Sequence, residues 1–336
     1  MEKKNLDKYI ANYFHDIEKI LLKEHPNNVI TLQFFQRRDN SILAGMEEVL
    51  ELLKEYTDTS KYQIKYLKDG SKIQNREVVL ELTGNYQYFG KYEGIIDGIL
   101  SRYSSLATNA NDCVIAANGK EVIFMGDRAD HYLMQERDGK AVTIGGITSM
   151  STEAQNIIQN DDTFGSVPHI FIQNFDGDTG KAMKAYLDMY PNVKIISLVD
   201  YHNNVIEQSL ESFKALGKNL YGVRIDTSKN MKDHMFDNEE DKPEYYGVNV
   251  EQIKRLRKSL DNAGANHVKI AVSSGFNPSK IAQFETEKAP VDAYGVGQAM
   301  FKMVCGFSAD ATILNGKNQA KEGRGYNHNF KLIEFK

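Results

Sequence analysis

The chain is poor in the residues that mark several large protein classes. Its 336 residues include six prolines, two cysteines and no tryptophan. The two cysteines, Cys113 and Cys305, stand far apart and form no CxxC pair, which excludes a zinc ribbon and argues against a disulfide framework. We therefore expect free thiols in a reducing compartment.

Long apolar runs and a strong net charge are also missing. No stretch of about 18 apolar residues occurs, so no membrane-spanning helix is predicted. The opening MEKKNLDKYIANYF lacks the apolar segment of a signal peptide. A net charge of -5 gives no bulk attraction to nucleic acid or to an anionic membrane. We expect a cytoplasmic protein that binds neither.

The apolar content suffices for a folded core, because 41% of the residues are hydrophobic and 18 are tyrosines. Residues 1–110 mix helical patterns with a few strand-like runs. By periodicity, helices are predicted over Tyr9–Leu22, Ser41–Tyr56 and Tyr92–Tyr103. Strands are predicted over Asn28–Phe35 and Arg76–Leu82.

From about Asp112 onward, short apolar strands alternate with amphipathic helices. Strands are predicted over Val193–Val199, Leu220–Ile225, His267–Val272 and Pro290–Tyr294. Helices are predicted over Val205–Leu216, Val250–Ala263 and Asn277–Phe284. This alternation is typical of βα units and predicts an α/β fold with a parallel sheet, either open or closed into a barrel.

Four consecutive predicted strands end in small or polar residues, and function gathers at the carboxyl ends of parallel strands. Two of these ends are the glycine-containing turns Ser273-Ser274-Gly275 and Gly295-Val296-Gly297. A glycine in such a turn is ordinarily there because the backbone of the turn requires it. Two such turns on neighbouring strands, each before a predicted helix, indicate a bound phosphomonoester.

The other two strand ends carry the aspartates Asp200 and Asp226. A carboxylate there suits a metal ion, a sugar hydroxyl or an arginine. Arg224 precedes Asp226 by two residues and shares its face of the strand. The alternative role is to cap the helix that follows the strand, and Asp200 could have this role.

Two further polar residues flank apolar runs. His169 begins the run HIFI, which we take as strand-like, and a lone histidine beside a strand is more often structural than catalytic. Arg128 follows the run EVIFM and could clamp a pyrophosphate or form a surface ion pair. The acidic insertion Lys232–Glu244 is predicted to be a solvated loop, with a mobile lid as the alternative.

Three motifs in the second half resemble the nicotinate phosphoribosyltransferase family. The chain has GVRIDT, then VSSGFNPSKIAQFE, then VDAYGVGQAMF, in the order and at the separations of the family's GVRxD[ST], SGG and D[FY]GVG motifs. Weaker matches are GSVPH, MGDRADH, IGGITSMST, ELTGNYQYFGKYEG, ANYFHDIEKIL and LNGKNQAKEGR. The resemblance runs from about residue 10 to 326 and is closest to the archaeal-type branch, without its C-terminal zinc ribbon.

The resemblance implies the fold of the type II phosphoribosyltransferases. An N-terminal α/β sandwich would span residues 1–110 and be completed by 309–336, and an irregular α/β barrel would span 111–308. Family members bind phosphoribosyl pyrophosphate with Mg²⁺ and make nicotinate mononucleotide for NAD salvage. They are homodimers or higher homo-oligomers whose site lies between one barrel and the partner's N-terminal domain.

The resemblance also assigns roles to residues. Asp226 and Asp200 would hold the ribose hydroxyls or a hydrated Mg²⁺, and His169 matches the histidine that some members phosphorylate with ATP. Arg128 and Arg224 would face the pyrophosphate and the nicotinate carboxylate. The 5′-phosphate would be cradled by Ser274, Gly275, Gly295 and Gly297, and the pyridine ring would stack on the partner subunit's Tyr13.

Ser274 replaces the first glycine of the family's SGG turn, and three further positions also depart from the family pattern. Ala129 replaces a second arginine, while Lys229 and Asn203 stand where many members have aspartate. These departures motivate a second hypothesis, a catalytically weak member that binds a nucleotide or phosphosugar. A third keeps the transfer but uses nicotinamide or quinolinate as acceptor.

Overall fold

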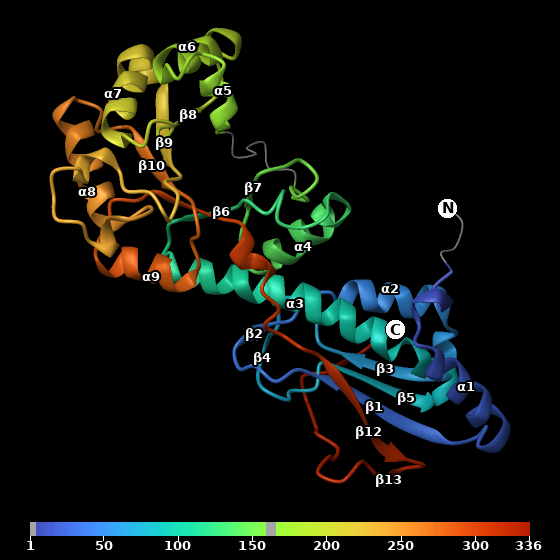
Figure 1. The fold of residues 1–336 in the computed structure, drawn as a ribbon. Coiled ribbons are helices and arrows are strands. Elements are labelled where there is room, and N and C mark those ends of the chain that lie inside the picture. Colours follow the sequence, from blue (N-terminus) through green and yellow to red (C-terminus); the bar gives the residue numbers. More distant parts are fainter. Residues whose placement is uncertain (1–4, 159–165) are drawn as a thin grey trace. The chain divides into compact units, whose positions relative to one another are not determined.

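The computed structural model describes residues 5–158 and 166–336, and the chain folds into two compact units (Figure 1). The first comprises Met1–Asn109, Ala141–Gly145 and Lys302–Lys336, and the second comprises Ala110–Lys140 and Gly146–Phe301. The C-terminal segment therefore belongs with the N-terminal one. Among the described residues, no helix is both long and apolar enough to cross a membrane.

The first unit is built on a six-stranded antiparallel sheet. In sheet order its strands are β13 (Lys317–Asn318), β12 (Ser308–Leu314), β1 (Val29–Phe35), β5 (Leu80–Asn85), β3 (Tyr62–Tyr66) and β14 (Ile333–Glu334). A separate ribbon pairs β2 (Ser41–Ile42) with β4 (Lys72–Ile73). Both edges of the large sheet thus come from the end of the chain, since the edge strand β13 pairs with β12 and the edge strand β14 pairs with β3.

Helices α1 (Asn12–Glu24), α2 (Met46–Tyr56) and the first part of α3 (Glu93–Ala116) complete this unit. Their buried side chains form one core with the sheet, including Phe14, Met46, Leu53, Ile96, Leu32 and Phe34. The helix predicted from Ser41 begins only at Met46, because Ser41 and Ile42 pair with β4 and Gly45 adopts a left-handed φ of 92°.

The second unit is built on a six-stranded sheet in which all strands are parallel. In order these are β7 (Ser149–Met150), β6 (Glu121–Phe124), β11 (Ala293–Val296), β10 (Lys269–Val272), β9 (Leu220–Ile225) and β8 (Ile195–Leu198). Among the described residues β7 does not pair with β8, so the barrel is incomplete. The predicted α/β class with a parallel sheet is confirmed.

Helices connect these strands. They are α4 (Gln135–Ile144, whose end joins the first unit), α5 (His169–Gln173), α6 (Thr179–Met189), α7 (Val205–Leu216), α8 (Val250–Asn262) and α9 (Pro278–Thr286). The strand-like interpretation of HIFI is wrong, because those residues form the short helix α5 after the extended Pro168. Five residues are too few to show a helical period. The strand predicted from Pro290 begins only at Ala293.

The acidic insertion Lys232–Glu244 is anchored rather than solvated throughout. Asp233 is fully buried and accepts hydrogen bonds from the backbone N–H of Val205 and of Met235, each at 3.0 Å. The ring of Phe236 stacks on that of Tyr245 at a centroid distance of 4.3 Å. The loop after β9 is therefore fixed to the start of α7.

Candidate active site

The predicted polar strand ends lie along one edge of the parallel sheet. Since β11, β10, β9 and β8 are neighbours in that order, their carboxyl ends form one row. The row carries Gly297, then Ser273–Gly275, then Asp226 and finally Asp200. The sequence prediction of where the polar strand ends gather therefore agrees with the sheet order.

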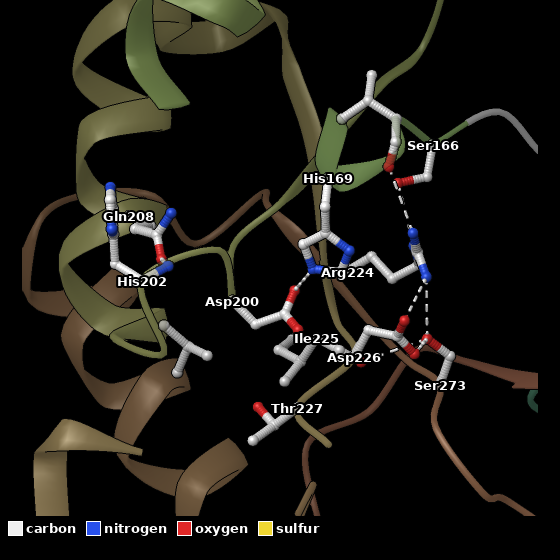
Figure 2. A network of polar contacts seen from close by, with 12 residues as sticks. Ser166, His169, Asp200, His202, Gln208, Arg224, Ile225, Asp226, Thr227 and Ser273 are labelled. Atoms are coloured by element: carbon white, nitrogen blue, oxygen red, sulfur yellow. Dashed lines mark hydrogen bonds and ion pairs between the residues drawn. The ribbon is translucent and has the colours of Figure 1, made fainter. Parts of the chain in front are cut away.

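At one end of the row His169 is held by Asp200 (Figure 2). The imidazole Nε2 lies 3.2 Å from Asp200 Oδ1, and the side chains are 47% and 6% exposed. The hydrogen bond to Asp200 raises the pKa of His169, with further contributions from the charges of Asp200 and Asp226, against burial and the opposing charge of Arg224. The pair therefore presents an accessible imidazole that a buried carboxylate orients.

Arg224 connects three segments through its guanidinium group (Figure 2). Its Nε donates to Ser166 Oγ at 3.1 Å and its Nη1 donates to Ser273 Oγ at 3.1 Å. Its Nη2 lies 3.4 Å from the carbonyl oxygen of Val167, and Nη1 lies 3.5 Å from Asp226 Oδ2. Arg224 thus connects the segment before His169 to β9 and to the end of β10. These bonds limit how far the Arg224 side chain can move toward a substrate.

Asp226 lies between Arg224 and Ser273. Its Oδ1 accepts a hydrogen bond of 2.6 Å from Ser273 Oγ, and its side chain is 22% exposed. It is therefore the more accessible of the two aspartates. An oriented, partly exposed carboxylate can bind hydroxyl groups or a hydrated cation.

The turn after β10 has the geometry of an anion site. Ser274 and Gly275 have φ values of 75° and 72°, and α9 begins three residues later. Among the described residues, none accepts a hydrogen bond from the backbone N–H of Gly275. Lys280 Nζ lies 3.5 Å from the carbonyl oxygen of Ser274, and burial lowers the pKa of this lysine. Free N–H groups and a nearby cation favour a bound anion.

The second glycine turn has a packing role that the sequence did not reveal. Gly295 lies inside β11, and a Cβ there would meet Met125 Sδ at 2.6 Å. A Cβ on Gly297 would meet the Met125 carbonyl oxygen at 2.6 Å. A short 3-10 helix follows these residues in place of the expected α-helix. Contact with the backbone of the neighbouring segment therefore requires glycine at Gly297, whereas at Gly295 a Cβ would displace the flexible end of the Met125 side chain.

Two predicted site residues, Arg128 and Tyr13, have exposed side chains. Arg128 follows β6, is exposed, and has no hydrogen bond or ion pair with any described residue. Tyr13 belongs to the first unit and is 59% exposed. Gly165 of the GSVPH motif lies outside the described residues. The network also includes Ser166 and Ser273, whose roles sequence reasoning missed although both lie in motifs it identified.

The chain is similar in sequence and in fold to known phosphoribosyltransferases. Residues 13–104 match the family model described as quinolinate phosphoribosyl transferase, N-terminal domain. A nicotinate phosphoribosyltransferase of Mycobacterium tuberculosis is 28% identical over 230 residues, which cover 66% of this chain and 44% of that protein. One from Bacillus subtilis is 22% identical over 307 residues, covering 81% and 58%. The chain thus spans less than two thirds of the length of either relative.

Solved structures match over nearly the whole chain. The nicotinate-nucleotide pyrophosphorylase from Pyrococcus furiosus has a TM-score of 0.83 at 28% identity, covering 98% of this chain and 82% of that one. Human nicotinic acid phosphoribosyltransferase has a TM-score of 0.71 at 16% identity, covering 92% and 76%, and supports the fold alone. The chain therefore has the fold of the type II phosphoribosyltransferases, and the motifs at its strand ends resemble those of the nicotinate phosphoribosyltransferase family.

Proposed function

We propose that this chain transfers the phosphoribosyl group of phosphoribosyl pyrophosphate to nicotinate, giving nicotinate mononucleotide and pyrophosphate for NAD salvage. One observation supports this most: Asp226 is oriented by Arg224 and Ser273 at the same sheet edge as the His169–Asp200 pair. A cytoplasmic setting suits the unpaired thiols of Cys113 and Cys305.

The reaction needs placement and charge stabilisation more than covalent chemistry. As pyrophosphate leaves, C1 of the ribose becomes oxocarbenium-like, and the attacking pyridine nitrogen must be held in line. Asp226 would bind the ribose hydroxyls and stabilise the positive charge that develops near them. The Ser274–Gly275 turn would hold the 5′-phosphate through backbone N–H groups.

The site suits Mg²⁺ that arrives with the substrate. Among the described residues, no group of three or more His, Cys, Asp and Glu side chains could form a metal cage. Mg²⁺ commonly uses one or two carboxylates together with substrate phosphates and water. Asp226 would be the main ligand, because Asp200 is nearly covered and already faces His169. When bound, the ion would neutralise charge on the leaving pyrophosphate.

Arginines would complete the recognition of anions. Arg128 has its full set of donors free among the described residues and suits the pyrophosphate. Arg224 has fewer donors left and would face the nicotinate carboxylate. Asn203 fits this scheme as a structural residue, since its amide donates to the Lys232 carbonyl, which a carboxylate could not do. Lys229 is exposed and could contact phosphate directly.

ATP coupling would proceed through His169. If Asp200 accepts the hydrogen on Nε2, the lone pair of Nδ1 is left as the nucleophile. An Nδ1–phosphorus bond would form while the terminal phosphoanhydride bond of ATP breaks and ADP leaves. Mass spectrometry of the intact protein after incubation with ATP tests this, with His169→Ala as control. A phosphorylated wild type and an unphosphorylated variant are expected.

We propose that the active form is a homodimer in which the partner subunit's Tyr13 stacks on the pyridine ring. Tyr13, Ile17 and Ile20 form an exposed apolar face on α1, which supports an interface there. Mixing inactive Tyr13→Ala and Asp226→Asn proteins tests the sharing of residues. Mixed dimers would contain one intact site and regain activity, whereas a site within one chain would give none.

Quinolinate is the second candidate acceptor, because residues 13–104 match the N-terminal domain model of quinolinate phosphoribosyl transferases. The experiment that separates the candidates supplies phosphoribosyl pyrophosphate, Mg²⁺ and one base at a time: nicotinate, quinolinate or nicotinamide. We expect the highest kcat/KM with nicotinate. If quinolinate gave a higher kcat/KM than nicotinate, with release of carbon dioxide, quinolinate would be the acceptor in place of nicotinate. Binding of phosphoribosyl pyrophosphate without any product would indicate a binding protein.

A further inference from the structure

The hydroxyl of Ser273 is the point at which Arg224 and Asp226 meet. Ser273 is 4% exposed, and its backbone N–H donates to the Ile225 carbonyl at 2.9 Å, which continues the β10–β9 pairing. Its Oγ lies 3.1 Å from Arg224 Nη1 and 2.6 Å from Asp226 Oδ1. These are the two charged side chains of β9 and its end (Figure 2).

The direction of both hydrogen bonds follows from the groups involved. A guanidinium has no acceptor, so Ser273 Oγ must accept from Arg224. An ionised carboxylate has no donor, so the single hydroxyl hydrogen is left for Asp226. The alternative acceptor, the Ile225 carbonyl, lies farther away at 3.5 Å. The arginine polarises the hydroxyl and strengthens its bond to the carboxylate.

The neighbouring residues give Ser273 little freedom. Ser273 faces Gly295 of the adjacent strand β11, since a Cβ built on that glycine would lie 3.1 Å from Ser273 Cβ, and burial leaves the hydroxyl beside β9. Ser274 and Gly275 differ, since both have positive φ and are more exposed. The three-residue turn is thus divided between a buried hydroxyl directed at a carboxylate and exposed backbone suited to an anion.

We propose that Ser273 is a positioning residue, which holds the Asp226 carboxylate in the orientation that the transfer needs. The inference rests on the proposed function, in which Asp226 binds the ribose. The SSG turn then has two roles. The Ser273 side chain orients Asp226, and the Ser274–Gly275 backbone binds the phosphate. Loss of the hydroxyl leaves phosphate binding intact and lets the carboxylate rotate.

The test compares Ser273→Ala with Ser197→Ala. Ser197 is a fully buried serine on β8 whose Oγ lies 2.8 Å from Ser212 Oγ, so its replacement removes a similar hydrogen bond away from Asp226. We expect Ser273→Ala to lower kcat about 10- to 100-fold with a change in KM for phosphoribosyl pyrophosphate below about threefold. Ser197→Ala should change kcat less than about twofold, while it lowers Tm by about as much as Ser273→Ala does.

A double-mutant cycle shows whether Ser273 acts through Asp226. In an Asp226→Asn background, Ser273→Ala should lower kcat no further, within about twofold. Two results overturn the inference. One is that Ser273→Ala lowers kcat in the Asp226→Asn background as much as it does alone, and the other is that Ser273→Ala alone leaves kcat unchanged. An Asp226→Asn protein with normal turnover would instead contradict the proposed function, so the two failures are distinguishable.

Discussion

Nε2 of His169 lies 3.2 Å from Oδ1 of Asp200, although the two residues come from segments 31 positions apart. The contact raises the pKa of His169 above its usual 6.5. Because the folded state favours protonation, this pair stabilises the fold fully below about pH 6.5, and the contribution is lost as pH rises through the folded pKa.

The first prediction is that Asp200→Asn lowers the pKa of His169. The amide removes both the hydrogen bond to a charged acceptor and the nearby negative charge, which are causes of the shift. Titration of the His169 ring by nuclear magnetic resonance, without Mg²⁺, measures it, with His169→Ala identifying the signal. An unchanged pKa in Asp200→Asn would refute the contact.

The second prediction concerns Asp97 on α3. Burial, with the nearby charge of Glu93, raises the pKa of Asp97 to about 7, and no described residue donates a hydrogen bond to its Oδ1. The unfolded state ionises near 3.8, so the fold loses stability as pH rises from about 4 to 7. Asp97→Asn should therefore stabilise the protein by about 1–3 kcal/mol at pH 8 and have little effect at pH 4. Urea unfolding at both values checks this; an equal effect at both pH values would contradict it.

The third prediction concerns the anchor of the acidic loop. Asp233 is fully buried and accepts hydrogen bonds from two backbone N–H groups, whereas Asp237 is exposed and, within the described part of the chain, its side chain bonds only to His234. Asp233→Ala should destabilise the protein by about 2–4 kcal/mol, because the buried N–H of Val205 and the half-buried N–H of Met235 both lose their acceptor, and should speed proteolysis within Lys232–Glu244. Asp237→Ala should change stability by less than about 0.5 kcal/mol. Equal effects would show that the loop is not anchored there.

The fourth prediction tests the packing role of Gly297. A Cβ would come within 2.6 Å of a backbone oxygen, so Gly297→Ala should cost about 1–3 kcal/mol of stability. Gly98, inside α3, has nothing within 4 Å of a built Cβ. Gly98→Ala should therefore stabilise by about 0.5–1 kcal/mol. Chemical unfolding of both variants measures the difference, and a neutral Gly297→Ala would leave phosphate binding as the reason for glycine.

Regular elements of the second unit were predictable from sequence. Leu220–Ile225 and Val205–Leu216 have the bounds that were predicted, because continuous apolar strands and amphipathic helices have distinct periods. The short helix at His169 was not, since five residues show no period. Nor could a sequence show that Ser41–Ile42 pairs with Lys72–Ile73, because such pairing depends on distant residues.

The position of the candidate site in the fold was predictable from sequence, but the contacts among its side chains were not. The pattern of apolar strands placed Asp200, Asp226 and Ser273–Gly275 at strand ends, and the sheet makes those ends neighbours. Which side chains contact one another depends on rotamers and strand register. For that reason the links from Arg224 to Ser166 and Ser273 emerged only from the structure. The same holds for the contact of Met125 with Gly297, which gives that glycine a packing role beside the predicted phosphate role.

The most direct test of the central claim is the stoichiometry of transfer by the purified chain. Radiolabelled nicotinate, phosphoribosyl pyrophosphate and Mg²⁺ are incubated with the protein, and nicotinate mononucleotide and pyrophosphate are quantified by chromatography. We predict equal amounts of the two products, with a rate at least about a hundredfold lower in Asp226→Asn. Absence of nicotinate mononucleotide from a folded protein that binds phosphoribosyl pyrophosphate would contradict the proposed function.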